Sequence, residues 1–305
     1  TLPLSSLLPH VNVAWALLAS LVVVVAWPRV GLPLHVATLA FAIAIDQVRI
    51  QPEWISLAVL LVATGPWRWS RTLGWAHLAS MWFWSGLNKA LSSGFTRSIP
   101  VLVAHNIGWR GAAGFLAFGI PAMEIGLGLL AAWTRTRWWA GVGGALLHGT
   151  TIFVLHMGFG WTILWWNVGL AFAAIVLLTD RRPDPTLSWT GPIRGVRDAA
   201  IVALFLYPAG SYLGVVDPYL AHHVYTQSTP RGIVCTKQFG CSSNPIDLTG
   251  AALKAPIPPA PRLLEEWFRR VCHRGDTLEV VGLRVRPFLR GLAGAADYTY
   301  RCPSR

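Results

Sequence analysis

Residues 81–95 read MWFWSGLNKALSSGF, and one residue in this stretch decides how the chain is interpreted. The stretch is mostly apolar and aromatic and closes a hydrophobic run that begins near Thr72, yet it contains Lys89. An ionisable group at membrane depth costs about 2.5–3.5 kcal/mol on insertion scales and usually faces a bundle interior or a wet cavity. Lys89 therefore either extends its ammonium group to the membrane surface or has a function.

The composition of the whole chain is typical of a membrane protein. Of its 305 residues 54% are hydrophobic and 12% are charged, whereas soluble domains carry about 25% charged residues. The formal net charge of +12 comes from Arg residues scattered through short loops and a terminal segment. This distribution fits membrane orientation and argues against a nucleic-acid partner. No cleavable signal peptide is evident.

Residues 1–220 are predicted to form an all-α polytopic membrane helix bundle of about eight spans. A span needs roughly 20 apolar residues, and such runs lie near residues 11–28, 31–46, 54–67, 73–92, 112–133, 138–157, 161–179 and 198–216. Short cytoplasmic loops collect Lys and Arg. Alternate connections carry Arg29, Arg68, Arg71, Arg135, Arg137, Arg181, Arg182, Arg194 and Arg197. We therefore expect a multi-pass protein of the cell membrane whose C-terminal tail is extracytoplasmic.

The tail, residues 221–305, is predicted to be a small extracytoplasmic α+β domain. Its segment 261–271 (PRLLEEWFRRV) has helical periodicity, and 277–285 (TLEVVGLRV) alternates like a strand. An even number of cysteines confined to such a segment predicts two disulfides, in any of three pairings. All four cysteines of the chain lie here: Cys235, Cys241, Cys272 and Cys302.

Several polar side chains from different spans are expected to meet in the outer half of the bundle. These are Asp46, Asn88, Lys89, Glu124, His148, His156 and Asn167. The pattern predicts a pocket in which a Lys, a carboxylate and a His exchange protons in a low dielectric. Structural roles stay open for some of them: His148 can bond a carbonyl one turn away, and Asp46 and His156 can be solvated near the interface.

The sequence predicts no metal site in the bundle. His148 and His156 are eight residues apart, about 80° around a helix and two turns along it, which is too far for joint ligation. Aromatic belts at the two interfaces explain most of the 17 Trp residues. A minority are expected to line the pocket, where their π faces could stabilise a cation: Trp82, Trp84, Trp165 and Trp166.

Four stretches resemble one known family. Trp84-Ser85-Gly86-Leu87-Asn88-Lys89, followed by Phe95, resembles a segment of the vitamin K-dependent γ-carboxylases and their bacterial relatives, the horizontally transferred transmembrane (HTTM) family. PAMEIGLGLL (121–130) resembles the family's Pro-x-x-Glu span, and LHGTTIFVLHMGFGWTILWWNVGLA (147–171) its His-led span with the turn that follows. VDPYLAHHVYT (216–226) is similar to a pattern in which Tyr-Leu precedes a strand leaving the membrane. Together they cover about half of the chain.

The resemblance implies a role for Lys89. In the carboxylases the matching Lys is regarded as the base that deprotonates a reduced naphthoquinone, whose oxygenation then drives proton abstraction from a peptide Glu. Carried over, Lys89 is the base, and Glu124, His148 and Asn167 are pocket groups. A reduced quinone is then the candidate cofactor. The carboxylases hold their peptide in a large lumenal region that this shorter tail lacks, so peptide carboxylation is not expected.

Three functions follow from these observations. The leading hypothesis is a membrane enzyme acting on a lipidic isoprenoid or quinone-type substrate, with catalytic residues Lys89, Glu124 and His148 and substrate-binding residues Asp46, Trp82, Asn88, His156, Trp165, Trp166 and Asn167. The second is a membrane terpene cyclase, in which Glu124 or Asp46 protonates an alkene and Trp faces stabilise the carbocation. The third is a non-catalytic scaffold or complex subunit whose polar residues only hold helices together.

Overall fold

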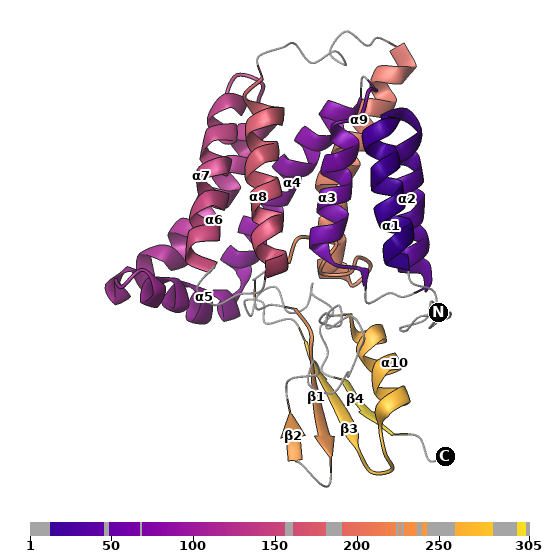
Figure 1. The fold of residues 1–305 in the computed structure, drawn as a ribbon. Helices are drawn as coiled ribbons and strands as arrows, with labels where there is room; N and C mark the ends of the chain where they lie inside the picture. The colour runs from indigo at the N-terminus through magenta and orange to yellow at the C-terminus, as the bar shows by residue number, and fades with distance from the viewer. Residues whose placement is uncertain are drawn as a thin grey trace.

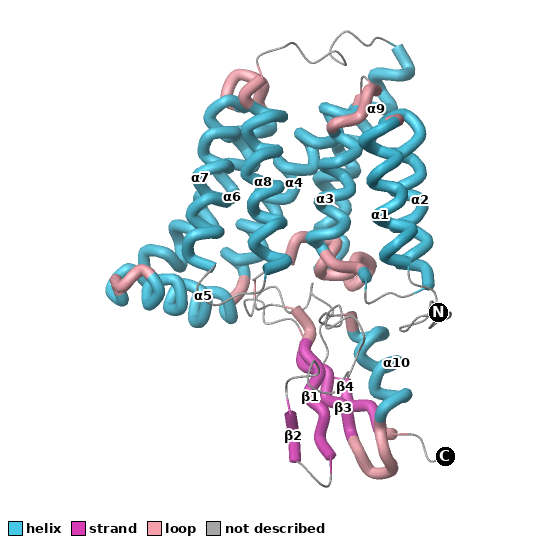
Figure 2. The backbone as a smooth tube through the Cα atoms, viewed as in Figure 1, coloured by secondary structure: helices cyan, strands magenta, loops and turns pink. Residues whose placement is uncertain are grey.

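The computed structural model describes residues 13–45, 49–67, 69–155, 161–180, 191–223, 226, 229–236, 240–242, 260–282 and 298–302. This part of the chain is mostly helical and has one small antiparallel sheet (Figure 1). The long helices stand side by side as a bundle, and the sheet lies beyond one end of it together with one further helix (Figure 2). The division into a helical part and a small part with a helix and a sheet agrees with the prediction from the sequence.

The helical part runs from α1 to η4. Its elements are α1 (Val13–Ala26), α2 (Pro28–Ile45), α3 (Pro52–Ala63), α4 (Ser70–Leu91), α5 (Ser93–Asn106), η2 (Arg110–Ala112), α6 (Ala113–Ala132), α7 (Arg137–Leu155), α8 (Trp161–Leu178), α9 (Gly191–Leu206) and η4 (Tyr207–Leu213). Within the described residues, two segments are long and apolar enough to cross a membrane: Pro28–Ile45 and Arg110–Ala132. Shorter apolar helices are Val13–Ala26, Pro52–Ala63, Leu164–Leu178 and Ile201–Leu213.

Two parts of the helical region differ from the prediction. The helix α5 was not expected, because Gly94, Arg97 and Pro100 interrupt the apolar pattern there. It begins because the Ser92 hydroxyl accepts a hydrogen bond from the Phe95 N–H at 3.0 Å, and it lies across the end of the bundle (Figure 1). The predicted last span, 198–216, is α9 followed by the 3-10 turn η4, which has Pro208 in its first turn.

The helix α4 lies at the centre of the bundle and packs closely against α6. A Cβ atom on Gly86 would lie 2.7 Å from the Pro121 carbonyl oxygen and 2.8 Å from the Ile125 nitrogen. A Cβ on Gly128 of α6 would lie 2.6 Å from the Phe83 nitrogen. Small residues allow two helix backbones to approach in this way. Gly86 lies one turn before Lys89 and packs against the turn of α6 that carries Glu124, so this approach brings the two side chains together.

Gly86→Ala is expected to lower the free energy of unfolding by about 1–3 kcal/mol, because the added methyl group meets backbone atoms that cannot rotate away. Thermal denaturation of the purified protein measures this. Gly126→Ala is the matched control, since a Cβ there meets no atom within 4 Å and Ala favours the helix. Equal midpoints for the Gly86→Ala variant and the parent protein would contradict the close approach of α4 and α6.

The mixed part consists of β1 (Arg231–Thr236), β2 (Gly240–Ser242), α10 (Pro261–Val271), β3 (Thr277–Val281) and β4 (Tyr298–Arg301). Its sheet has the order β2-β1-β3-β4, and all its pairs are antiparallel. The predicted helix at 261–271 and the strand at the start of 277–285 are confirmed. A separate core joins α10 to the sheet through Leu263, Leu264, Trp267, Phe268, Leu278 and Val280.

Two disulfides tie this part together, and the structure selects one of the three possible pairings. Cys235 of β1 is bonded to Cys241 of β2, and Cys272, at the end of α10, is bonded to Cys302 after β4. The second bond closes the larger loop, with a sequence separation of 30. Such bonds compensate for the small core of a domain of this size.

Candidate active site

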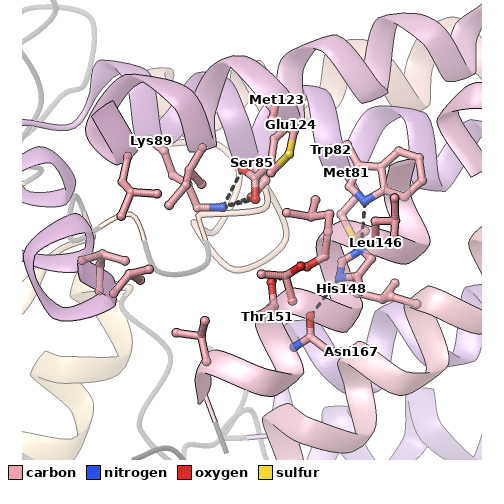
Figure 3. Close-up of a pocket in the computed structure, with 18 of the residues that line it drawn as sticks. Met81, Trp82, Ser85, Lys89, Met123, Glu124, Leu146, His148, Thr151 and Asn167 are labelled. Atoms are coloured by element: carbon pink, nitrogen blue, oxygen red, sulfur yellow. Dashed lines mark hydrogen bonds and ion pairs between the residues drawn. The ribbon is translucent and has the colours of Figure 1, made fainter. Parts of the chain in front are cut away.

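A cavity of about 450 Å³ lies among α4, α5, α6, α7 and α8 (Figure 3). Pockets that hold small molecules have volumes of about 300–1,000 Å³ and are mostly apolar with a few placed polar groups. This cavity has that character. Its wall is largely aliphatic and aromatic, and its polar side chains include Ser85, Lys89, Glu124, His148, Thr151, Asn167 and His222.

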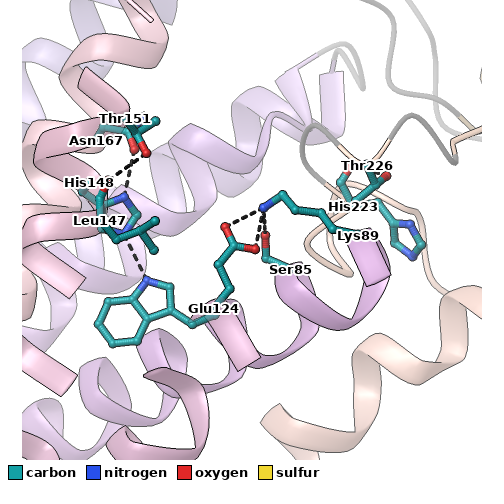
Figure 4. A network of polar contacts seen from close by, with 10 residues as sticks. Ser85, Lys89, Glu124, Leu147, His148, Thr151, Asn167, His223 and Thr226 are labelled. Carbon is teal, nitrogen blue, oxygen red and sulfur yellow. Dashed lines mark hydrogen bonds and ion pairs between the residues drawn. The ribbon is translucent and has the colours of Figure 1, made fainter. Parts of the chain in front are cut away.

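A buried ion pair forms one corner of the cavity. The Lys89 Nζ lies 2.6 Å from both carboxylate oxygens of Glu124 and donates to the Ser85 hydroxyl at 2.7 Å (Figure 4). Lys89 is only 5% exposed and Glu124 only 8%, so the ammonium group does not extend to the surface. Ser85 reaches Lys89 because residues four apart share a helix face. An ammonium group has three N–H bonds, and these partners use all of them.

His148 forms a second polar corner, away from the ion pair (Figure 3). The Trp82 indole N–H donates to its Nε2 at 3.0 Å, and its Nδ1 lies 2.8 Å from the Asn167 side-chain oxygen. Because an indole N–H can only donate, Nε2 is the acceptor and Nδ1 carries the proton. His148 is thus held as one neutral tautomer with both ring nitrogens bonded. In this geometry it is better suited to shape the cavity than to take a proton from a substrate.

Of the remaining residues that were predicted to line the pocket, some lie in the cavity wall, some lie elsewhere, and some are outside the described residues. Trp166 lines the cavity, and its buried indole N–H has no hydrogen-bond partner in the described structure. Trp165, the preceding residue on α8, is 63% exposed and is not part of the cavity wall. Trp84 donates to the Phe205 carbonyl at 2.6 Å and is not part of the cavity wall. Asp46 and His156 lie outside the described residues.

Asn88 is buried, but it bonds a different part of the chain. Its side-chain nitrogen donates to the Ala221 carbonyl at 2.8 Å, and its oxygen accepts from the Tyr212 hydroxyl at 2.5 Å. Asn88 therefore connects the end of α4 to η4 and to the segment that follows it. Asn88 is not among the residues that line the cavity, and its contact with substrate stays a prediction.

Three features of the cavity were missed by the sequence analysis. Ser85 could have been found, because it precedes Lys89 by one helical turn. The wall contributed by α5 was missed because that helix was not predicted. His222 lies in the segment after η4, where no periodic pattern indicates the direction of a side chain.

Within the described residues, no three His, Cys, Asp or Glu side chains gather in a group that could hold a metal ion. Comparison of the chain with models of known families, with curated protein sequences and with solved structures finds no match. The resemblance to the HTTM family therefore depends on the four sequence stretches alone.

Proposed function

We propose that the chain is an integral membrane enzyme that binds a lipidic, isoprenoid or quinone-type substrate in the cavity and moves a proton with the Lys89–Glu124 pair. In this proposal the helices form a polytopic bundle of about eight spans, and the disulfide-bonded part is extracytoplasmic. The observation that carries it is the buried ion pair at the wall of an apolar cavity. A buried ion pair is a poor source of stability compared with apolar packing, so its presence beside a cavity favours a chemical role.

The outward surface of the bundle supports a membrane location. Large apolar side chains are exposed on several helices, including Trp15, Val25, Phe115, Phe118, Phe172 and Leu206. Soluble monomers rarely expose large contiguous apolar surface, whereas lipid chains would cover these side chains. The two disulfides are typical of oxidising compartments outside the cytoplasm.

The ion pair is equipped to take a proton from a lipid hydroxyl group. When the substrate O–H bond breaks, the proton ends on the Glu124 carboxylate and forms its O–H bond. The Lys89 ammonium then pairs with the new substrate oxyanion, so the buried charge stays balanced. The end state is the same if Lys89 first passes a proton to Glu124 and then accepts one as an amine. The cavity excludes water from this exchange.

The two other hypotheses agree less well with this geometry. A terpene cyclase must protonate an alkene with a neutral acid, whereas both Glu124 oxygens accept from an ammonium group at 2.6 Å. In this arrangement both oxygens act as acceptors, so neither presents the O–H bond that an acid would donate to an alkene. A scaffold whose ion pair only joins α4 to α6 has no need of a cavity beside it.

Val154→Phe is expected to weaken binding of a prenylated 1,4-naphthoquinone by at least about tenfold, because Val154 is buried in the cavity wall and the larger ring fills the space. Quenching of tryptophan fluorescence in the purified protein reports binding, since Trp82 and Trp166 line the cavity. Val202→Phe is the control, because Val202 is 53% exposed on α9. Binding that is absent in the parent protein, or equal in both variants, would refute the proposed lipid site.

A further inference from the structure

His222 is a buried histidine of the cavity wall, and its ring nitrogens are available to bond a ligand. It is 8% exposed and lines the cavity, and its ring nitrogens have no hydrogen-bond partner among the described residues. Buried polar groups are nearly always bonded, and the other buried histidines follow this rule. His77 bonds Ser56 at 2.9 Å, His223 bonds Ser211 at 3.0 Å, and His148 uses both nitrogens.

The backbone of His222 is strained. Its φ is +61°, and no other non-glycine residue in the described ranges has a positive φ. Such a conformation costs about 1–3 kcal/mol and persists where the surroundings enforce it, often at ligand-binding positions. Within the described residues, no hydrogen bond of the His222 ring compensates for this strain.

Contacts on both sides hold His222 in this conformation. The Ala221 carbonyl accepts from Asn88 at 2.8 Å, and the His223 N–H donates to the Pro218 carbonyl at 3.0 Å. The Tyr207 hydroxyl donates to the Leu220 carbonyl. The ring itself packs edge-on against His77, with centroids 5.7 Å apart. Both the backbone and the ring of His222 are therefore fixed before any ligand arrives.

We infer that His222 binds the oxygen of the lipid head group and so holds that head in the cavity. The inference rests on the proposed function, in which the ligand carries a hydroxyl group, and adds the residue that binds this group and so selects against a pure hydrocarbon. Burial, with smaller effects from His77 and His223, lowers the pKa of His222 well below its ordinary value. The neutral ring offers one donor and one acceptor, and a hydroxyl group needs that combination. The unpartnered Trp166 N–H offers a further donor on the cavity wall.

His222→Gly separates the ligand contact from the fold, because glycine adopts a positive φ without strain. The probes are geranylgeraniol and a C20 hydrocarbon of the same skeleton, and native mass spectrometry of the purified full chain measures their binding. We expect His222→Gly to weaken alcohol binding about tenfold, as for the loss of one buried hydrogen bond. Hydrocarbon binding should be unchanged, and the denaturation midpoint should not fall.

His223→Ala is the matched control. This neighbour is also buried but bonds Ser211 and is absent from the cavity wall, so its loss should lower the midpoint and leave the preference for the alcohol intact. Equal alcohol binding by His222→Gly and the parent protein would overturn the role of His222 and leave the lipid site standing. If the parent protein binds the prenylated 1,4-naphthoquinone but not the alcohol, the inference about His222 is overturned; if it binds none of the three probes, the proposed function itself fails.

Discussion

Glu124→Gln is expected to lower the free energy of unfolding by about 3–5 kcal/mol, because it leaves the Lys89 ammonium group buried without its counter-charge. Lys89→Met should cost less, since an unpaired Glu124 can become neutral by taking up a proton. The double variant Lys89→Met, Glu124→Leu removes both charges and keeps similar volume. Its stability should return to within about 1 kcal/mol of the parent protein or exceed it. Denaturation of Lys89→Met, of Glu124→Leu and of the double variant gives the coupling energy as a double-mutant cycle.

A partly exposed ion pair provides the reference for this cycle. Arg71 donates to Asp180 at 2.8 Å, and their side chains are 25% and 35% exposed. Asp180→Asn should cost no more than about 1 kcal/mol, because solvent screens such pairs. If Glu124→Gln lowers the free energy of unfolding no more than Asp180→Asn does, the Lys89–Glu124 pair is not buried as described.

The sequence predicted the regular elements well where hydrophobic periodicity was strong. The helix α4 lies within a few residues of the predicted 73–92, and α10 has the predicted bounds. Periodicity failed at α5, whose start depends on a Ser92 cap and whose course crosses the bundle. It also failed to place the end of α9, because an apolar run continues through the 3-10 turn η4.

The candidate site could be predicted in its residues but not in its pairing. Ionisable groups within apolar runs stand out, so Lys89, Glu124 and His148 were recognised. Whether Glu124 pairs with Lys89 or with His148 depends on the rotation and approach of α6, which Gly86 and Gly128 determine through contacts far apart in the sequence. His222 could not be recognised, because its direction depends on a backbone conformation held by Asn88.

On the proposed function, turnover of the lipid substrate is expected to fall about 10²–10⁴-fold in Glu124→Gln, in Lys89→Met and in the double variant, because each removes the group that accepts the proton, the group that pairs with the substrate oxyanion, or both. Lipid profiles of membranes that contain each variant, measured by mass spectrometry, report turnover. Asp180→Asn is the control for an ion pair far from the cavity and should keep the parent profile.

The double variant and Lys89→Met distinguish the three functions, because folding and chemistry respond differently. A double variant that is stable and leaves the lipid profile unchanged is the result expected of a scaffold, since nothing but the helix contact was replaced. A stable double variant with lost turnover indicates an enzyme. Lys89→Met then separates the two mechanisms: without the ammonium group Glu124 becomes the neutral acid that a terpene cyclase requires, so a cyclase would keep its turnover. An enzyme that stabilises a substrate oxyanion beside Lys89 would lose it.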